Sequence, residues 1–362
     1  MTDKKTLFIH AGGSKTGSSA LQNFLSDKSS WLKSLGFAFE HGLTYEFGSN
    51  NGVLLFKELT SSNSSEDGLD VLLLSYFGQS NKAICSSEYF QLAKSQDWKR
   101  LVESTNRLGI EVRVIFYVRN IMPFFLSSYD QSIKRLGECK SFDEWVVLQD
   151  WQHASALRIM ENELPHSSLR ILHYEHERDN LLRGFLDILC IDSSFNIDHN
   201  DKKQQVNRSL TNKEREVLLA VNKVLGGTYS TELSNFLIHA NPNQKGESVL
   251  YNKATERYLV DRFSDEVDWV NQAFFDSKSV VSVLPVESDK NVSNVHRVSQ
   301  STQNTNIEKR LLYWALDKLK SIQSETEQRM VKVLHDAARN VEGKEHPDIP
   351  ADFDSIAYLL LN

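Results

Sequence analysis

Short apolar runs alternate with amphipathic stretches along the first two-thirds of the chain. Runs with the composition of buried strands occupy residues 7–11, 83–86, 112–118 and 169–174. Helical spacing of apolar side chains predicts helices over residues 17–35, 121–136 and 178–190. Apolar strands that alternate with helices are typical of a parallel sheet covered on both faces. The pattern therefore predicts an α/β fold, a three-layer α/β/α sandwich with a mostly parallel sheet.

The remainder of the chain is predicted to be helical, apart from a polar stretch. Helical patterns occupy residues 211–224, 230–239, 250–264 and 266–275. Residues 285–305 are rich in Ser, Asn and Gln, which is typical of a linker. Residues 306–341 carry a long apolar stripe that should pack on the main domain or on a second chain, as in a homodimer. We expect a main domain over 1–280, a polar linker over 281–305 and a helical C-terminal extension over 306–362.

Composition narrows the class of protein. Of 362 residues, 41 are Lys or Arg and 48 are Asp or Glu, and the formal net charge of −7 argues against a general nucleic-acid binder. The 3 cysteines are too few for a disulfide framework, which favours a reducing compartment. No run of about 18 apolar residues predicts a membrane span, and no secretory signal is evident. A cytoplasmic protein is expected.

A glycine-rich loop with one lysine follows the first expected strand. Its sequence is Gly12-Gly13-Ser14-Lys15-Thr16-Gly17-Ser18-Ser19, and a helical pattern begins directly after it. Glycines let backbone N–H groups approach a ligand, and a helix N-terminus adds partial positive charge. Lys15 adds a full charge, and the hydroxyls of the loop add donors. The loop is a candidate site for a phosphate or sulfate group.

The order of residues in this loop differs from that of a nucleotide triphosphatase. That motif reads G-x-x-x-x-G-K-[ST] and holds Mg²⁺ with its hydroxyl, whereas here Lys15 precedes Gly17. The next two expected strands lead into Ser86-Ser87-Glu88 and Arg119-Asn120, so neither ends in an Asp that would support a metal. A Mg²⁺-dependent phosphotransferase, a kinase, stays the alternative enzyme. A non-catalytic nucleotide-binding scaffold is the alternative outside enzymes.

Residues 9–22 resemble the opening of the sulfotransferases that use 3′-phosphoadenosine 5′-phosphosulfate (PAPS), and more narrowly bacterial members that begin IHIGxxKTGTTxLQ. Ala11 and the Ser18-Ser19 pair depart mildly from that string, and the resemblance extends over residues 6–275. It implies a P-loop-like fold, PAPS as co-substrate, no metal, and an acceptor hydroxyl that we expect on a carbohydrate or glycan. The residues that would hold the 5′-phosphosulfate are Gly13, Ser14, Lys15, Thr16, Gly17, Ser18 and Ser19. Lys15 would also stabilise the leaving phosphate.

An arginine and a serine after the third expected strand form a second candidate element. Arg119 leaves the strand, and Ser127 follows eight residues later in the expected helix. A guanidinium offers a planar fork for bidentate contact with phosphate, and a hydroxyl adds a donor. The stretch from Ser127 to Lys134 resembles the family's SxYxQxxK, which implies that Arg119 and Ser127 hold the 3′-phosphate of PAPS. Taken alone, an arginine at a strand end also fits a surface salt bridge.

A weaker segment, residues 206–210, resembles an NxSLS-type stretch of bacterial relatives. The resemblance would allow Arg208 to contact the nucleotide. Helix capping by Ser209 or Thr211 explains the same residues equally well.

Sulfuryl transfer to a hydroxyl is helped by a general base that takes the acceptor proton. Glu88 is expected at the carboxyl edge of the sheet, where ligands bind in open α/β folds, although an acidic residue after a serine cap also has a structural explanation. His10 is the second candidate, but a histidine within a strand is more commonly a core residue. His41 and His153 rank third. No His/Cys cluster has metal-ligand spacing, and the candidate catalytic residues are Lys15, Glu88 and His10.

Overall fold

The computed structural model describes residues 4–39, 50–191 and 208–285. The chain divides into two compact units. The first comprises Met1–Phe124, Asp150–Lys203 and Lys253–Val286, and the second comprises Phe125–Gln149, Gln204–Asn252 and Glu287–Asn362. The division falls within helix α6 (Ile121–Leu136). The helix expected over 306–341 and almost all of the expected linker lie outside the described residues.

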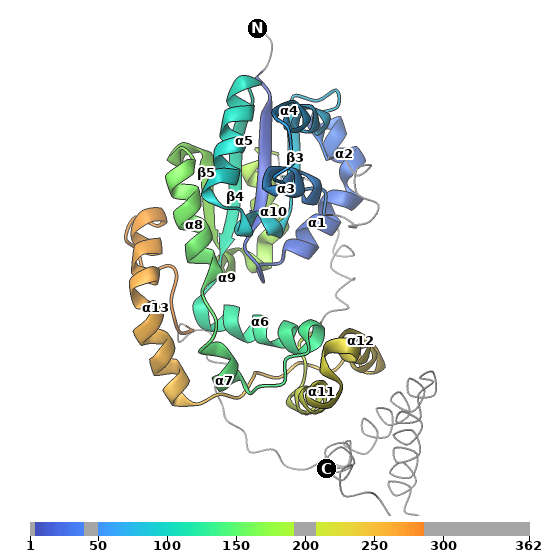
Figure 1. Ribbon diagram of the computed structural model, residues 1–362, viewed down its shortest axis with the longest axis vertical. Helices are drawn as coiled ribbons and strands as arrows, with labels where there is room; N and C mark the ends of the chain where they lie inside the picture. Colours follow the sequence, from blue (N-terminus) through green and yellow to red (C-terminus); the bar gives the residue numbers. More distant parts are fainter. Residues whose placement is uncertain (1–3, 40–49, 192–207, 286–362) are drawn as a thin grey trace, which may run out of the picture. The chain divides into compact units, whose positions relative to one another are not determined.

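A five-stranded sheet organises the first unit, in the order β2-β3-β1-β4-β5 (Figure 1). The strands are β1 (Thr6–Gly12), β2 (Phe37–Ala38), β3 (Lys82–Ser86), β4 (Glu111–Val118) and β5 (Leu169–His173). Every neighbouring pair is parallel. The predicted parallel sheet is confirmed, and each expected apolar run forms a strand. Strand β2 was not predicted, because two residues are too short to form a pattern.

Helices cover both faces of the sheet, which confirms the predicted three-layer, P-loop-like fold. On one face, Phe8, Ile84, Ile115 and Tyr117 join a core with apolar residues of α1 (Ser18–Asp27), α2 (Ser29–Ser34) and α10 (Leu181–Ile188). On the other face lie α5 (Ser95–Arg107) and α8 (Gln152–Glu163), in front of the strands in Figure 1. The first unit also contains α3 (Val53–Thr60), α4 (Glu66–Ser75), the 3₁₀ turn η1 (Glu88–Leu92), α9 (Tyr174–Glu177) and α13 (Lys253–Phe274).

Several expected helices differ from those in the structure. The helix expected over 17–35 is interrupted at Lys28, between α1 and α2. The two helices expected over 250–264 and 266–275 are the single helix α13, because no Gly or Pro interrupts this stretch. Its buried face continues across the expected break through Leu259, Phe263, Val267 and Val270. The helix expected over 121–136 is confirmed as α6.

The second unit is helical. It contains most of α6, together with α7 (Phe142–Val146), α11 (Asn212–Leu225) and α12 (Ser230–Ala240). Thr211 and Glu214 form a reciprocal capping box at the start of α11, so the capping interpretation of Thr211 is correct. Arg215 of α11 donates to both carboxylate oxygens of Asp130 in α6, at 2.6 and 3.1 Å. Both side chains are buried, so this ion pair lies inside the unit.

An asparagine side chain continues the strand pairing at one edge of the sheet. β2 pairs only with Lys82 and Ala83 of β3. Beyond that point, Asn51 Nδ2 donates to the Ile84 carbonyl at 2.9 Å, and Asn51 Oδ1 accepts from the Ser86 amide at 2.8 Å. The Asn51 side chain therefore replaces a neighbouring strand along the last residues of β3. In the parts of the chain that the structure describes, no helix has the length and apolar character that a membrane crossing requires.

Candidate functional site

The glycine-rich loop lies at the carboxyl end of β1, the central strand, which β3 and β4 flank. Its backbone is left-handed at Gly12, Gly13, Lys15 and Gly17, with φ of 83°, 85°, 67° and 79°. Gly13 cannot carry a side chain, because an added Cβ would lie 2.0 Å from the carbonyl oxygen of Tyr117 in β4. The loop therefore packs directly on the end of β4, as its glycines allow.

Unpaired donors gather where the loop enters α1. Gly17 is the N-cap residue, and no side chain caps this helix. In the described ranges, the amides of Thr16, Gly17, Ser18 and Ser19 donate to no acceptor. The Ser18 hydroxyl is buried and likewise has no hydrogen-bond partner. Free amides at a helix start, with a buried hydroxyl beside them, fit a phosphate- or sulfate-bearing ligand.

Side chains from distant parts of the sequence hold the other half of the loop. The Ser14 amide donates to Gln91 Oε1 at 2.9 Å, and the Ser14 carbonyl lies 3.0 Å from His153 Nε2. The Lys15 carbonyl accepts from Arg119 Nη1 at 2.7 Å, and Thr16 Oγ1 donates to the Gly13 carbonyl at 2.5 Å. The Ser14 amide and the Thr16 hydroxyl are therefore engaged within the protein. The predicted contacts of Ser14 and Thr16 with a phosphosulfate stay predictions.

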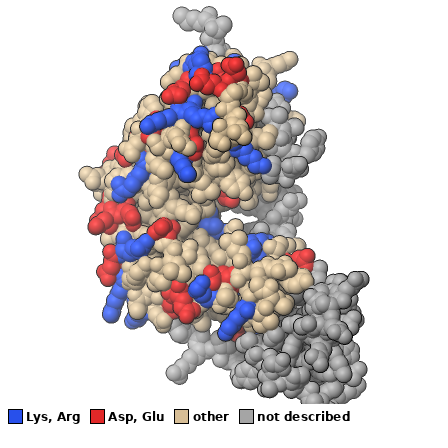
Figure 2. Space-filling model, viewed as in Figure 1, with Lys and Arg blue, Asp and Glu red and all other residues tan. Residues whose placement is uncertain are grey.

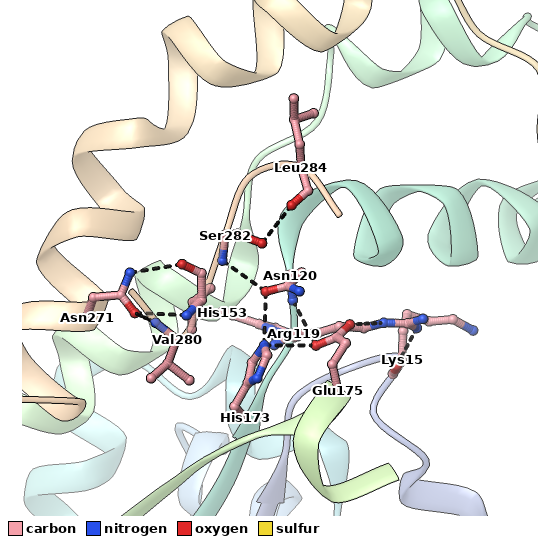
Figure 3. A network of polar contacts seen from close by, with 11 residues as sticks. Lys15, Arg119, Asn120, His153, His173, Glu175, Asn271, Val280, Ser282 and Leu284 are labelled. Atoms are coloured by element: carbon pink, nitrogen blue, oxygen red, sulfur yellow. Dashed lines mark hydrogen bonds and ion pairs between the residues drawn. The ribbon is translucent and has the colours of Figure 1, made fainter. Parts of the chain in front are cut away.

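Arg119, at the end of β4, contacts both the loop and an acidic residue (Figure 3). Its Nε donates to Glu175 Oε1 at 3.2 Å, and its guanidinium carbon lies 5.1 Å from the centre of the Tyr174 ring. Burial alone would raise the pKa of Glu175. The hydrogen bond from His173 and the charge of Arg119 outweigh burial, and the pKa is lowered. The salt bridge considered for Arg119 is thus present, and its contact with a 3′-phosphate stays a prediction.

Asn120, the next residue, connects this region to the end of the described chain. Its Oδ1 accepts from His173 Nε2 and from the Ser282 amide, both at 2.9 Å (Figure 3). The amides of Ile121 and Met122 donate to the carbonyls of Ser282 and Val283, at 3.1 and 2.9 Å. The segment after α13 therefore occupies the first donors of α6. The sequence does not predict this contact, because no local motif links residues 120 and 282.

Glu88 is the candidate base that lies beside the loop. It opens η1, and Ser87 caps that turn by accepting from the Tyr89 amide at 3.2 Å, as the structural interpretation expects. Glu88 also packs against the loop, since a Cβ added to Gly12 would lie 2.6 Å from the Glu88 Cα. Within the described ranges, no hydrogen bond or ion pair engages its carboxylate. The position of Glu88 is compatible with a general base, and that role stays a prediction.

The histidines considered as bases lie in other environments. His10 is 1% exposed, and its Nδ1 lies 2.8 Å from Ser86 Oγ. Burial lowers the pKa of His10 to about 3. His153 is fully buried, and its two ring nitrogens face the backbone of Ser14 and Arg119. Both imidazoles are buried and face groups of the protein, which favours the interpretation as core residues over that as a base, and His41 lies outside the described residues.

Ser127 and Arg208 belong to the second unit, so their predicted convergence with Arg119 on one nucleotide stays a prediction. Ser127 is half-buried on α6. Arg208 donates to both carboxylate oxygens of Glu214, at 2.8 and 2.6 Å, and to the Asn241 carbonyl at 2.9 Å. Glu214 is fully buried, so Arg208 supplies its counter-charge. Across the described ranges, no group of three or more His, Cys, Asp or Glu side chains could hold a metal ion.

Comparison with known proteins finds only a distant structural similarity. No model of a protein family matches the chain, and no curated protein matches it. Among solved structures, the chain is similar to the crystal structure of a sulfotransferase from Alicyclobacillus acidocaldarius, with 12% sequence identity and a TM-score of 0.34. The match covers 57% of this chain and 91% of that one. A likeness of this size carries no conclusion about activity.

Proposed function

We propose that the protein transfers a sulfuryl group from PAPS to an acceptor hydroxyl, which we expect on a carbohydrate or glycan. The observation that carries the proposal is the loop at the end of β1. There, the unpaired amides of residues 16–19 and the buried Ser18 hydroxyl lie next to Lys15. These donors suit the 5′-phosphosulfate of PAPS, and the sequence of the loop resembles that of PAPS-dependent enzymes.

The chemistry assigns separate tasks to the residues around the loop. A bond forms between the acceptor oxygen and sulfur, while the bond between sulfur and the bridging phosphate oxygen breaks. The leaving phosphate gains negative charge, which Lys15 and the free amides would stabilise. Glu88 would take the proton of the acceptor hydroxyl. The products are a sulfate ester and 3′-phosphoadenosine 5′-phosphate (PAP).

Calorimetry with matched nucleotides tests the choice of ligand. PAP should bind more tightly than AMP, because loss of a charge-assisted contact to the 3′-phosphate costs roughly 1.5–3 kcal/mol, or about tenfold to a hundredfold in affinity. Equal affinity for PAP and AMP would show that Arg119 does not bind a 3′-phosphate. Tight binding of ATP with Mg²⁺, and none of PAP, would favour the phosphotransferase.

Lys15→Ala tests the role of the loop in turnover. Lysine and alanine both carry a Cβ, so the left-handed backbone at this position is equally strained in the variant. The substitution therefore mainly removes the charge. We expect turnover to fall by about 10²–10³, with a smaller change in PAP affinity. Lys28→Ala, at the opposite end of α1, is the matched control and should keep normal turnover. Near-normal turnover of Lys15→Ala would show that the charge is not used in the reaction.

A further inference from the structure

Both backbone polar groups of Ser14, which belong to the two peptide groups on either side of its Cα, are held by side chains from other elements. The Ser14 amide donates to Gln91 of η1 at 2.9 Å, and the Ser14 carbonyl faces His153 Nε2 of α8 at 3.0 Å. The free amides of the loop begin two residues later, at Thr16. The orientation of those amides therefore depends on how firmly the Ser14 backbone is fixed.

The surroundings of His153 determine which ring nitrogen carries the proton. The Arg119 amide faces Nδ1 at 3.3 Å and can only donate, so Nδ1 accepts. The proton is then on Nε2, which donates to the Ser14 carbonyl. The rings of Phe116 and Phe124 surround the imidazole, with centroids at 5.5 and 4.7 Å. Burial lowers the pKa of His153 to about 4, which keeps this neutral tautomer near neutral pH.

We propose that His153 and Gln91 are positioning residues that hold the backbone on both sides of the Ser14 Cα, so that the amides of residues 16–19 face the 5′-phosphosulfate. The inference rests on the proposed function, because it concerns the group that PAPS would place in the loop. His153 joins the loop to the end of β4 through a single imidazole, since its other nitrogen accepts from Arg119. A displacement of the loop by about 1 Å can lower the reaction rate on the order of 10²-fold. A contact that fixes the loop can therefore affect catalysis.

Two substitutions of His153 separate its two contacts. A glutamine amide can take the place of Nε2 and keep the bond to Ser14, whereas an asparagine amide can take the place of Nδ1 and keep the bond from Arg119. In calorimetry, His153→Gln should bind PAP within about threefold of wild type, and His153→Asn should bind at least about tenfold more weakly. Ile110→Ala, at the opposite end of β4, lowers stability without touching the loop and should bind normally. Wild-type affinity in His153→Asn would overturn the proposal.

Gln91→Leu provides an independent test of this positioning role. Because Gln91 and His153 hold the two peptide groups that flank the Ser14 Cα, Gln91→Leu combined with His153→Asn should weaken PAP binding by less than the product of the single effects. Strictly multiplicative losses would mean that the two side chains do not act through the same backbone segment.

Hydrogen exchange of the Ser14 amide in the ligand-free protein keeps the inference separate from the proposed function. The amide should exchange faster in Gln91→Leu and in His153→Asn than in Ile110→Ala. An unchanged rate would refute the positioning role, whatever the protein binds. Failure of the wild-type protein to bind PAP, with faster exchange in the variants, would refute only the proposed function.

Discussion

Residues of the loop fall into two groups with different consequences for mutation. The backbone of Ser14 and the carbonyl of Lys15 are bonded to Gln91, His153 and Arg119. The amides of residues 16–19 are unpaired within the described ranges. Changes in the first group should act on the shape of the loop, and changes in the second should act on the ligand itself.

Glu88→Gln should lower turnover with little effect on nucleotide binding. The substitution keeps the shape of the side chain and removes the proton acceptor, so turnover should fall by about 10²–10⁴. The structural interpretation of Glu88 expects instead a loss of stability below about 1 kcal/mol from weaker pairing with the helix dipole, with activity retained. Turnover and melting temperature measured on one preparation distinguish the two outcomes.

The buried histidines should make the protein less stable in mild acid. The pKa values of His10 and His153 are lowered from 6.5 to about 3 and about 4, so these groups stay neutral in the folded state while the unfolded chain takes up protons below pH 6.5. The free energy of unfolding therefore falls as the pH drops from 7 to 5, by roughly 2 kcal/mol for each histidine.

Denaturant titrations at pH 7 and pH 5 measure this effect. In His153→Gln, the free energy of unfolding should differ less between pH 7 and pH 5 than it does in wild type, by roughly 2 kcal/mol. His166→Gln, which replaces an exposed ring, is the control and should show the wild-type difference. If His153→Gln also shows the wild-type difference, His153 is not held neutral by burial.

The loop could be recognised from the sequence because its glycines, lysine and hydroxyls are contiguous. Gln91, His153 and Glu175 reach the same region from η1, α8 and α9, and only the tertiary structure brings them there. Sequence patterns also left His10 undecided between a base and a core residue. A strand residue shows its burial only once the covering helices are in place.

Helices α1 and α6 both begin near the carboxyl edge of the sheet, yet their first turns differ. The start of α1 has no side-chain cap and no acidic residue in its first turn. The start of α6 is occupied by the carbonyls of Ser282 and Val283. Of these two helix starts, only that of α1 keeps free donors for an anion within the described ranges.

Arg215→Met should strongly destabilise the second unit. Arg215 and Asp130 are about nine-tenths buried as side chains, at 6% and 10% exposure, so removal of one partner leaves an unpaired buried charge. We expect a loss of roughly 3–5 kcal/mol in the free energy of unfolding. Arg262→Met breaks the exposed pair with Asp150 and should cost less than about 1 kcal/mol. Similar losses of stability in the two variants would contradict the prediction that the buried pair costs more to break than the exposed pair.

Strands and helices were predictable where apolar periodicity was strong, as in β4 and α6. The continuity of α13 was missed because polar residues near the middle of the stretch looked like a boundary. The burial of Leu259, Phe263, Val267 and Val270 on one face shows that the helix continues past them. Helices α3, α4, α5, α7 and α8 lie in stretches where apolar periodicity predicted no element.

At the scale of the whole molecule, the chain returns after α13 to the middle of the first unit. Val281 is 1% exposed, and Asn271 Nδ2 donates to the Val281 carbonyl at 2.9 Å. The start of the linker expected over 281–305 is therefore part of the packed unit, although most of that stretch lies outside the described residues.

A chain ending at residue 279 should be less stable than one ending at residue 285. The shorter chain loses the carbonyls that accept from the Ile121 and Met122 amides, as well as the buried side chain of Val281. Burial of a valine contributes about 1.5–3 kcal/mol, so the midpoint of denaturant unfolding should be clearly lower. Identical unfolding curves for the two chains would show that the returning segment does not stabilise the first unit.

The Asn51 side chain also affects how the protein behaves among other copies of itself. An open strand edge invites pairing with another chain, and natural proteins cover or interrupt such edges. Because β2 is so short, the last residues of β3 would form such an edge if Asn51 did not occupy the Ile84 carbonyl and the Ser86 amide. The amide offers hydrogen bonds without offering a strand that could be extended. The Asn51 side chain and the Gly52 amide, which donates to the Ser86 carbonyl at 2.9 Å, together cover this stretch of the edge and should disfavour its pairing with another chain.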